Sequence, residues 1–128
     1  MTQYIDKYLD ESLRVAKLQL ELKPTFLEIA NQVLERVLQD GTVFFCGNGG
    51  SAADSQHLAA ELVGRFKKNR KPIRSISLTT DTSIITSTGN DFSFDEIFSR
   101  QLTAIGRKGD VLIAISTVSY THLTLPTI

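Results

Sequence analysis

Two side chains with acid–base and metal-binding chemistry stand near the middle of the chain, at His57 and Glu61. At this i, i+4 spacing they would share one face of a helix, with Cβ atoms about 5–6 Å apart. An imidazole and a carboxylate so placed can hold one metal ion together, or act as a base and its partner. The alternative is a surface pair contributing only about 0.3 kcal/mol. The spacing alone leaves both interpretations open.

A glycine-rich segment, Gly47-Asn48-Gly49-Gly50-Ser51, precedes this pair. Backbone N–H groups at the start of a helix favour phosphate or another anion. The segment is neither a P-loop, since no lysine follows the glycines, nor a dinucleotide-binding fingerprint, since the spacing differs. The alternative is that Gly49-Gly50 forms a tight turn and Ser51 only caps the helix, with Asp54 completing a capping-box pattern.

Cationic side chains follow the His57–Glu61 pair. Arg65 comes one turn beyond Glu61 on nearly the same helical face, where it could meet an anionic substrate. The basic run over residues 67–71 is expected to be a solvated loop. Cys46 ends an apolar run and has no histidine or acid tied to it by spacing, so we expect a core residue rather than a nucleophile.

Length and composition limit the classes of protein. The chain has 128 residues, 41% of them hydrophobic, which predicts one globular domain. A formal net charge of zero argues against generic nucleic-acid binding. No stretch of about 18 apolar residues and no leader pattern is present, so neither membrane spanning nor secretion is expected. One cysteine allows no intramolecular disulfide and no thiolate cluster for zinc, which favours a cytoplasmic location.

Hydrophobic periodicity predicts the elements that would position these residues. Helices are expected over residues 4–22, 24–39 (largely buried), 51–63, 82–87 and 94–105, with a turn at 89–91, and strands over 42–46, 74–78 and 111–115. This alternation predicts a three-layer, doubly wound α/β fold with a parallel sheet, preceded by N-terminal helices. The ligand crevice would lie beyond the carboxyl ends of the strands, at residues 47–51, 79–81 and 116–117.

Four blocks of sequence resemble the phosphoheptose isomerase family of the sugar-isomerase (SIS) domain superfamily. They lie at residues 45–51, 56–66, 89–92 and 109–117, in the family's order and spacing. The resemblance implies a flavodoxin-like SIS fold, of which residues 1–117 form the N-terminal part. It also implies an enzyme that interconverts sedoheptulose 7-phosphate and D-glycero-D-manno-heptose 7-phosphate, for bacterial lipopolysaccharide precursors. Such an enzyme is cytoplasmic, homotetrameric and assisted by one zinc ion per subunit.

The resemblance also implies roles for single residues. Asn48, Gly49 and Gly50 would bind substrate, and Ser51 would help to hold its phosphate. His57 and Glu61 would be zinc ligands, with Glu61 also the general base. Asn90 and Asp91 would contact the sugar, whereas Ser116 and Thr117 would hold phosphate. An aldose–ketose isomerisation needs such a base to move a proton between C1 and C2.

The sequence departs from the family after Thr117. The family continues with Ser-Gly-Asn-Ser and two further βα units, whose Gln and His complete the metal and acid–base set. Here residues 118–128 follow instead, and His122 comes too early to replace the late histidine. We therefore expect a truncated SIS domain with a foreign tail, inactive by itself. Alternatives are a non-catalytic relative that binds the replication initiator, which Glu61 disfavours, and a sugar-phosphate-sensing domain.

Overall fold

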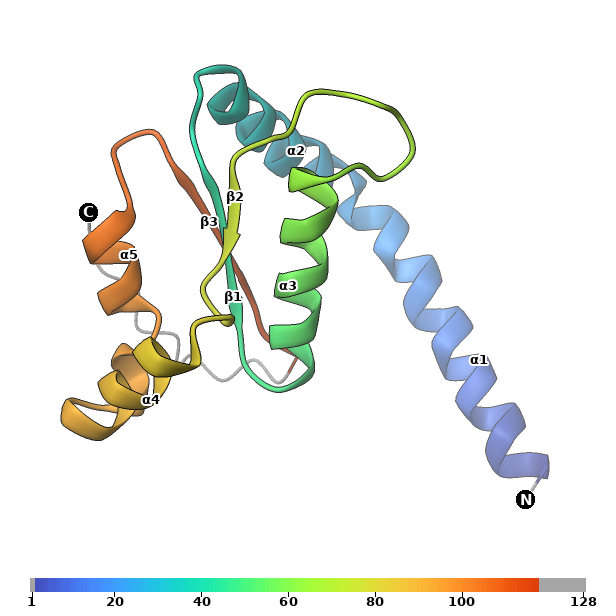
Figure 1. The fold of residues 1–128 in the computed structure, drawn as a ribbon. Helices are drawn as coiled ribbons and strands as arrows, with labels where there is room; N and C mark the ends of the chain where they lie inside the picture. Colours follow the sequence, from blue (N-terminus) through green and yellow to red (C-terminus); the bar gives the residue numbers. More distant parts are fainter. Residues whose placement is uncertain (1, 118–128) are drawn as a thin grey trace. The chain divides into compact units, whose positions relative to one another are not determined.

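The N-terminal part of the chain is helical in the computed structural model, which describes residues 2–117 (Figure 1). Residues 1–34 and 35–128 form two compact units, and helix α2 begins in the first and ends in the second. Helix α1 (Thr2–Leu18) leads through a 3₁₀ turn, η1 (Gln19–Leu22), into α2 (Lys23–Leu38). The predicted break before Pro24 is thus a tightened turn, and the proline lies in the first turn of α2, where its missing N–H is tolerated.

Helix α2 is not largely buried, contrary to expectation. Neither α1 nor α2 contains a buried residue. Large apolar side chains of α2 are exposed, namely Phe26, Leu27, Ile29, Leu34 and Leu38. An apolar stripe reveals that a helix can be covered, but it does not reveal whether the covering element belongs to the same chain.

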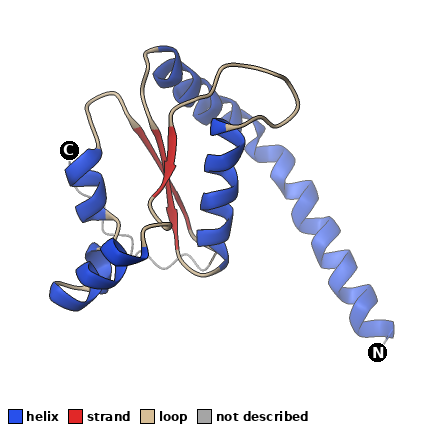
Figure 2. Cartoon of the chain, viewed as in Figure 1, coloured by secondary structure: helices blue, strands red, loops and turns tan. Residues whose placement is uncertain are grey.

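The second unit is built on a parallel sheet of three strands (Figure 2). Strand β1 (Val43–Gly47) lies between β2 (Ser75–Ser77) and β3 (Val111–Ile115). Phe45 pairs with Ser77 on one side and with Ile113 on the other. The chain therefore winds outward from β1 to β2 and then crosses back to the opposite edge at β3.

Helices cover both faces of this sheet, as expected for a doubly wound fold (Figure 1). Helix α3 (Gly50–Val63) lies on one face. Helix α4 (Thr82–Asp91), the 3₁₀ turn η2 (Phe94–Glu96) and helix α5 (Ser99–Ile105) lie on the other. All five residues of β1 are buried, which confirms the prediction from its uninterrupted apolar run.

Successive side chains of β1 point to opposite faces of the sheet, so the strand contributes to the core on both faces. Phe44 and Cys46 belong to one buried cluster, which also contains Leu78, Ile97, Phe98 and Leu102. The intervening residues of β1 point toward α3. The buried residues of α3 are all small: Ser51, Ser55 and Ala59. Helix α3 can therefore approach the sheet closely.

Two elements of the second unit differ from the prediction. Gly89, Asn90 and Asp91 continue α4 instead of forming a turn. The predicted helix over residues 94–105 is interrupted at Ile97 and Phe98, both of which are buried in the core cluster. Packing of these two neighbouring side chains outweighs the local preference for a continuous helix.

Candidate functional site

Two of the candidate segments, residues 48–51 and 116–117, follow the strand ends where the winding of the sheet reverses. Strands β1 and β3 are neighbours, although they are separated in sequence by helix α3, strand β2, helix α4, the turn η2 and helix α5. Their carboxyl ends coincide, because Gly47 pairs with Ile115. Asn48 to Gly50 and Ser116-Thr117 follow these ends directly and are exposed. In open α/β sheets, ligands bind in the crevice at such a reversal.

Gly47 brings three elements into close approach at this point. A Cβ at Gly47 would lie 2.7 Å from the Ser51 Cβ and 2.9 Å from the carbonyl oxygen of Ile115. Only a residue without a side chain permits these contacts. The structure thus places Ser51 beside the last residue of β3, immediately before Ser116, as predicted for two converging loops.

Ser51 does not cap helix α3. The cap residue is Gly49, at φ 57°, and it makes no side-chain capping bond. Ser51 already lies inside the helix, with its N–H donating to the Asn48 carbonyl oxygen at 3.0 Å. Its hydroxyl takes part in no hydrogen bond with any described residue, which differs from Ser55, whose Oγ donates to the Ser51 carbonyl oxygen at 2.7 Å. The capping-box alternative is therefore wrong, and within residues 2–117 the Ser51 hydroxyl has no bond that would compete with a ligand.

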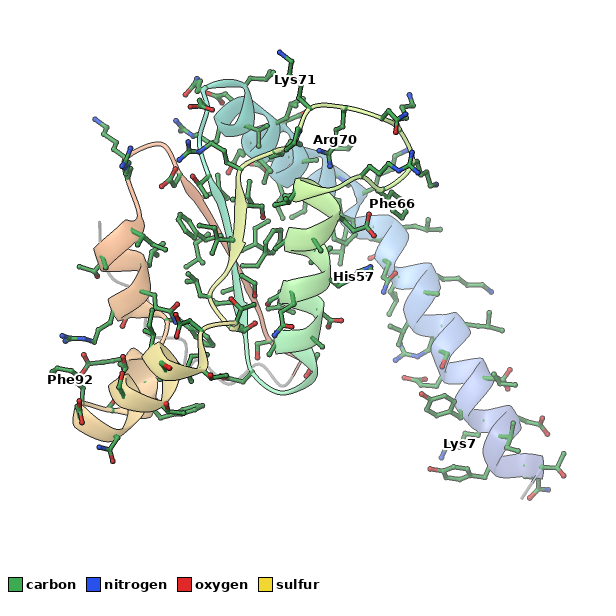
Figure 3. All side chains as sticks on the ribbon, viewed as in Figure 1. Lys7, His57, Phe66, Arg70, Lys71 and Phe92 are labelled. Atoms are coloured by element: carbon green, nitrogen blue, oxygen red, sulfur yellow. The ribbon has the colours of Figure 1, made fainter. Side chains whose placement is uncertain are left out.

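His57 and Glu61 share one face of α3, as their spacing predicted. The distance from His57 Nε2 to Glu61 Oε1 is 3.7 Å. Figure 3 labels His57 on α3. Its side chain is 74% exposed, whereas that of Glu61 is 29% exposed. Glu61 Oε2 is fully buried and has no hydrogen-bond partner. A buried carboxylate oxygen without a donor is costly, so this atom is available to a ligand.

The geometry of the pair is compatible with two ligands of one metal ion. Zinc binds imidazole nitrogen and carboxylate oxygen at about 2.0–2.2 Å, so two ligand atoms of a tetrahedral site lie roughly 3.4 Å apart. The observed 3.7 Å is close to that separation. However, residues 2–117 contain no group of three or more His, Cys, Asp or Glu side chains placed to hold a metal. His57 and Glu61 would therefore be two of the ligands, and His122 lies outside the described residues.

Arg65 is not on the helical face of Glu61. Helix α3 ends at Val63, Gly64 caps it, and Arg65 Nη1 donates to Asn69 Oδ1 at 2.6 Å in the following loop. The basic run is exposed, as expected for a solvated loop. One member of it has a defined structural role, because Arg70 donates to the Glu61 and Leu62 carbonyl oxygens at 2.6 and 2.7 Å.

Asn90 and Asp91 are not brought to the glycine loop by any hydrogen bond. They lie in the last turn of α4, where Asn90 Nδ2 donates to Asp91 Oδ1 at 3.0 Å. Both are exposed. Their assignment as sugar contacts stays a prediction.

Residues that spacing could not identify fasten α3 to the rest of the unit. Gln56 Nε2 donates to Thr79 Oγ1, and Arg70 reaches back to the end of α3. The first contact joins residues that are 23 positions apart in the sequence, and the second joins residues that are 9 apart. No local sequence pattern therefore indicates them. No helix in the described range is long and apolar enough to cross a membrane.

Comparison with known proteins gives the family. A family model described as "SIS domain" matches residues 4–123. A curated phosphoheptose isomerase from Neisseria gonorrhoeae is 51% identical over 110 residues, which are 84% of this chain and 55% of the relative. One from Rhodospirillum rubrum is 57% identical over 94 residues, 73% of this chain and 50% of the relative. The chain thus spans about half the length of the curated relatives it matches.

Solved structures agree with this assignment. The structure of a phosphoheptose isomerase from Neisseria gonorrhoeae aligns with a TM-score of 0.82 at 41% identity, over 95% of this chain and 64% of that one. A phosphoheptose isomerase from Francisella tularensis aligns with a TM-score of 0.80 at 31% identity, over 90% of this chain and 61% of that one. The parallel α/β fold of this chain is therefore shared with these enzymes, and the chain belongs to the SIS domain family.

Proposed function

We propose that this chain is the N-terminal part of an aldose–ketose isomerase that converts sedoheptulose 7-phosphate to D-glycero-D-manno-heptose 7-phosphate. The observation that carries the proposal is Glu61, whose Oε2 is buried and unpartnered one helical turn from His57. The same helix begins at an open glycine loop beside the reversal of the sheet. A carboxylate base and an anion-binding loop on one helix suit a phosphorylated sugar.

The phosphate end of the substrate would bind where β1 and β3 end. The N–H groups of Gly49 and Gly50 and the Ser51 hydroxyl would donate to phosphate oxygens from one loop, and Ser116 and Thr117 from the other. Asn48 would contact the sugar beside them, and Asn90 and Asp91 would contribute further polar contacts. The convergence of Ser51 and Ile115 around Gly47 supports this placement.

Glu61 would move the proton. Its carboxylate would take a proton from one of the two carbons that exchange oxidation state, C1 and C2, and return it to the other. The absence of a hydrogen-bond partner for the buried Oε2 among the described residues supports this role, because no other donor occupies that oxygen. Zinc held by His57, Glu61 and ligands outside residues 2–117 would act as a Lewis acid toward the sugar oxygens.

The remaining features of the proposal concern the whole protein. We propose that the complete enzyme is a homotetramer, which the exposed apolar side chains of α2 support. The chain is proposed to depart from the family after Thr117, although the family match extends to residue 123. The 128-residue chain alone is proposed to lack isomerase activity, because residues 2–117 contain no group of three or more side chains placed to hold a metal. A cytoplasmic role in lipopolysaccharide precursor synthesis accords with the single cysteine.

Binding of the substrate tests the phosphate site without requiring turnover. Sedoheptulose 7-phosphate is titrated into the chain and into Ser51→Ala and Ser116→Ala variants by thermal shift. Each substitution should weaken binding by about 1–3 kcal/mol, the usual loss for a hydrogen bond to a charged group. Ser87→Ala is the control, because the exposed Ser87 hydroxyl bonds only within α4, to the Ile84 carbonyl oxygen. Equal affinity of all four proteins would contradict the proposed site.

A further inference from the structure

The polar end of strand β2 has no part in the proposed chemistry. Residues 79–81 follow that strand and were expected to line the ligand crevice. The structure uses two of them within their own segment: Thr80 Oγ1 donates to the Ser77 carbonyl oxygen at 3.1 Å, and Asp81 Oδ1 accepts from the Ile84 N–H at 2.9 Å, which caps α4. Thr79 instead reaches across to α3.

The Thr79 hydroxyl forms hydrogen bonds with three groups. Gln56 Nε2 donates to Thr79 Oγ1 at 3.1 Å, and Ser77 Oγ lies 2.8 Å from the same atom. Thr79 Oγ1 in turn lies 3.3 Å from the carbonyl oxygen of Ala52, to which it donates. The hydroxyl therefore bonds to α3 at two positions one turn apart, Ala52 and Gln56.

The packing of α3 explains why such a link matters. The stripe of α3 that faces the sheet consists of Ser51, Ser55 and Ala59. Small side chains allow a close approach, but they form shallow ridges that resist sliding and rotation weakly. Hydrogen bonds on the flank of the helix have strict geometry, so they fix the rotation and axial position of α3, which this packing constrains only weakly.

We propose that Thr79, together with Gln56, is a positioning device that sets the rotation and axial register of α3 against the sheet. Residues 51, 57 and 61 all lie on this one helix, so its rotation determines where the Ser51 hydroxyl and the His57–Glu61 pair point. Thr79 touches neither of these groups and acts through α3. The inference rests on the proposed function, since it assumes that Ser51 meets a phosphate.

Three variants of the 128-residue chain test the inference. Thr79→Val keeps the shape of the side chain and removes the hydroxyl, whereas Thr79→Ser keeps the hydroxyl. Thr86→Val is the matched control, because Thr86 is exposed and its hydroxyl bonds only within α4, to the Thr82 and Ser83 carbonyl oxygens. The probe is inorganic phosphate, titrated well below the melting temperature, and amide hydrogen exchange along α3 is measured in parallel.

Loss of the Thr79 hydroxyl should raise the phosphate dissociation constant by about fivefold or more and speed exchange in the first half of α3. Thr79→Ser and Thr86→Val should stay within about twofold of the original chain. A merely stabilising role for Thr79 would lower the melting temperature without changing phosphate affinity in the folded state. Should Thr79→Val fail to fold, Gln56→Met removes the amide from an exposed position and should give the same change.

Two results would overturn the inference, and they are distinguishable. If the original chain binds phosphate and both Thr79→Val and Gln56→Met bind it equally well, the inference alone is wrong. If the original chain binds no phosphate, the phosphate site of the proposed function is wrong, and the inference falls with it.

Discussion

At the scale of single residues, Gly47 is the position on which the geometry of the site depends most. A methyl group there would overlap the Ser51 Cβ and the Ile115 carbonyl oxygen. Gly47→Ala should therefore lower the free energy of unfolding by about 1–3 kcal/mol, as overpacking usually does. Gly50→Ala is the control, since a Cβ at Gly50 would meet nothing within 4 Å. Urea denaturation measures both, and an equal effect of the two substitutions would contradict the close packing at Gly47.

Cys46 should make the stability of the folded protein depend on pH in the alkaline range. Burial raises the pKa of its thiol to about 11, because the thiolate would be poorly solvated in the core. The unfolded chain ionises at lower pH, so between about pH 9 and 11 the folded state holds the proton and the unfolded state does not. Stability should then fall with rising pH, by at most about 1.4 kcal/mol per pH unit.

Urea denaturation of the original chain and of Cys46→Ala at pH 8, 9 and 10 measures this dependence. The difference in unfolding free energy between the two proteins should shrink as the pH rises. A difference that stays constant with pH would show that the thiol titrates alike in both states.

Single residues also mark the limit of what sequence can predict here. The His57–Glu61 pair and the burial of Cys46 followed from helical spacing and from a continuous apolar run. The position of Ser51 inside the helix could not be predicted in this way. Gly49 takes the cap position at a positive φ, which the sequence pattern does not reveal. Arg65 was misplaced because α3 ends two residues before it.

At the scale of elements, the C-terminal end of α3 is held by a distant cation. The last carbonyl groups of a helix lack partners within the helix, and Arg70 supplies donors to those of Glu61 and Leu62. Figure 3 labels Arg70 beside this end of the helix, next to Lys71. Glu61 therefore lies in a turn whose stability depends on a loop residue.

Replacement of Arg70 should loosen this turn. Arg70→Met removes the donors, and amide exchange at Leu62, Val63 and Gly64 should quicken by about fivefold. Lys71→Met removes the same charge from the neighbouring exposed position and should leave these amides unchanged. Equal exchange in the two variants would indicate that α3 ends stably without Arg70.

Element order was predictable, but element ends were not. The change from a helical period to a five-residue apolar strand located β1, and the glycine loop located the start of α3. The break at Ile97 and Phe98 depends on the core that these side chains join, and the exposure of α2 depends on which surfaces are available to cover it. Both features depend on tertiary packing, which the hydrophobic periodicity of the sequence does not reveal.

At the scale of the whole molecule, the chain spans about half the length of the curated relatives it matches. This half contains the glycine loop, the neighbouring ends of β1 and β3 and the His57–Glu61 pair. Supplying the other half from a relative should therefore restore a complete enzyme. The matched part of the Neisseria gonorrhoeae relative shares 51% identity, so its remaining segment is a suitable donor.

The most direct measurement is the turnover of sedoheptulose 7-phosphate by residues 1–117 of this chain joined to the C-terminal part of that relative. The fusion should isomerise the substrate, and Glu61→Gln should reduce kcat by about 10²–10⁴-fold, as expected for loss of a general base. Glu96→Gln, which removes an exposed carboxylate paired with Arg100, should leave kcat unchanged. A folded fusion in which Glu61→Gln turns over as fast as Glu96→Gln would contradict the central claim. A folded fusion without any turnover would also contradict it, and would favour a non-catalytic SIS protein.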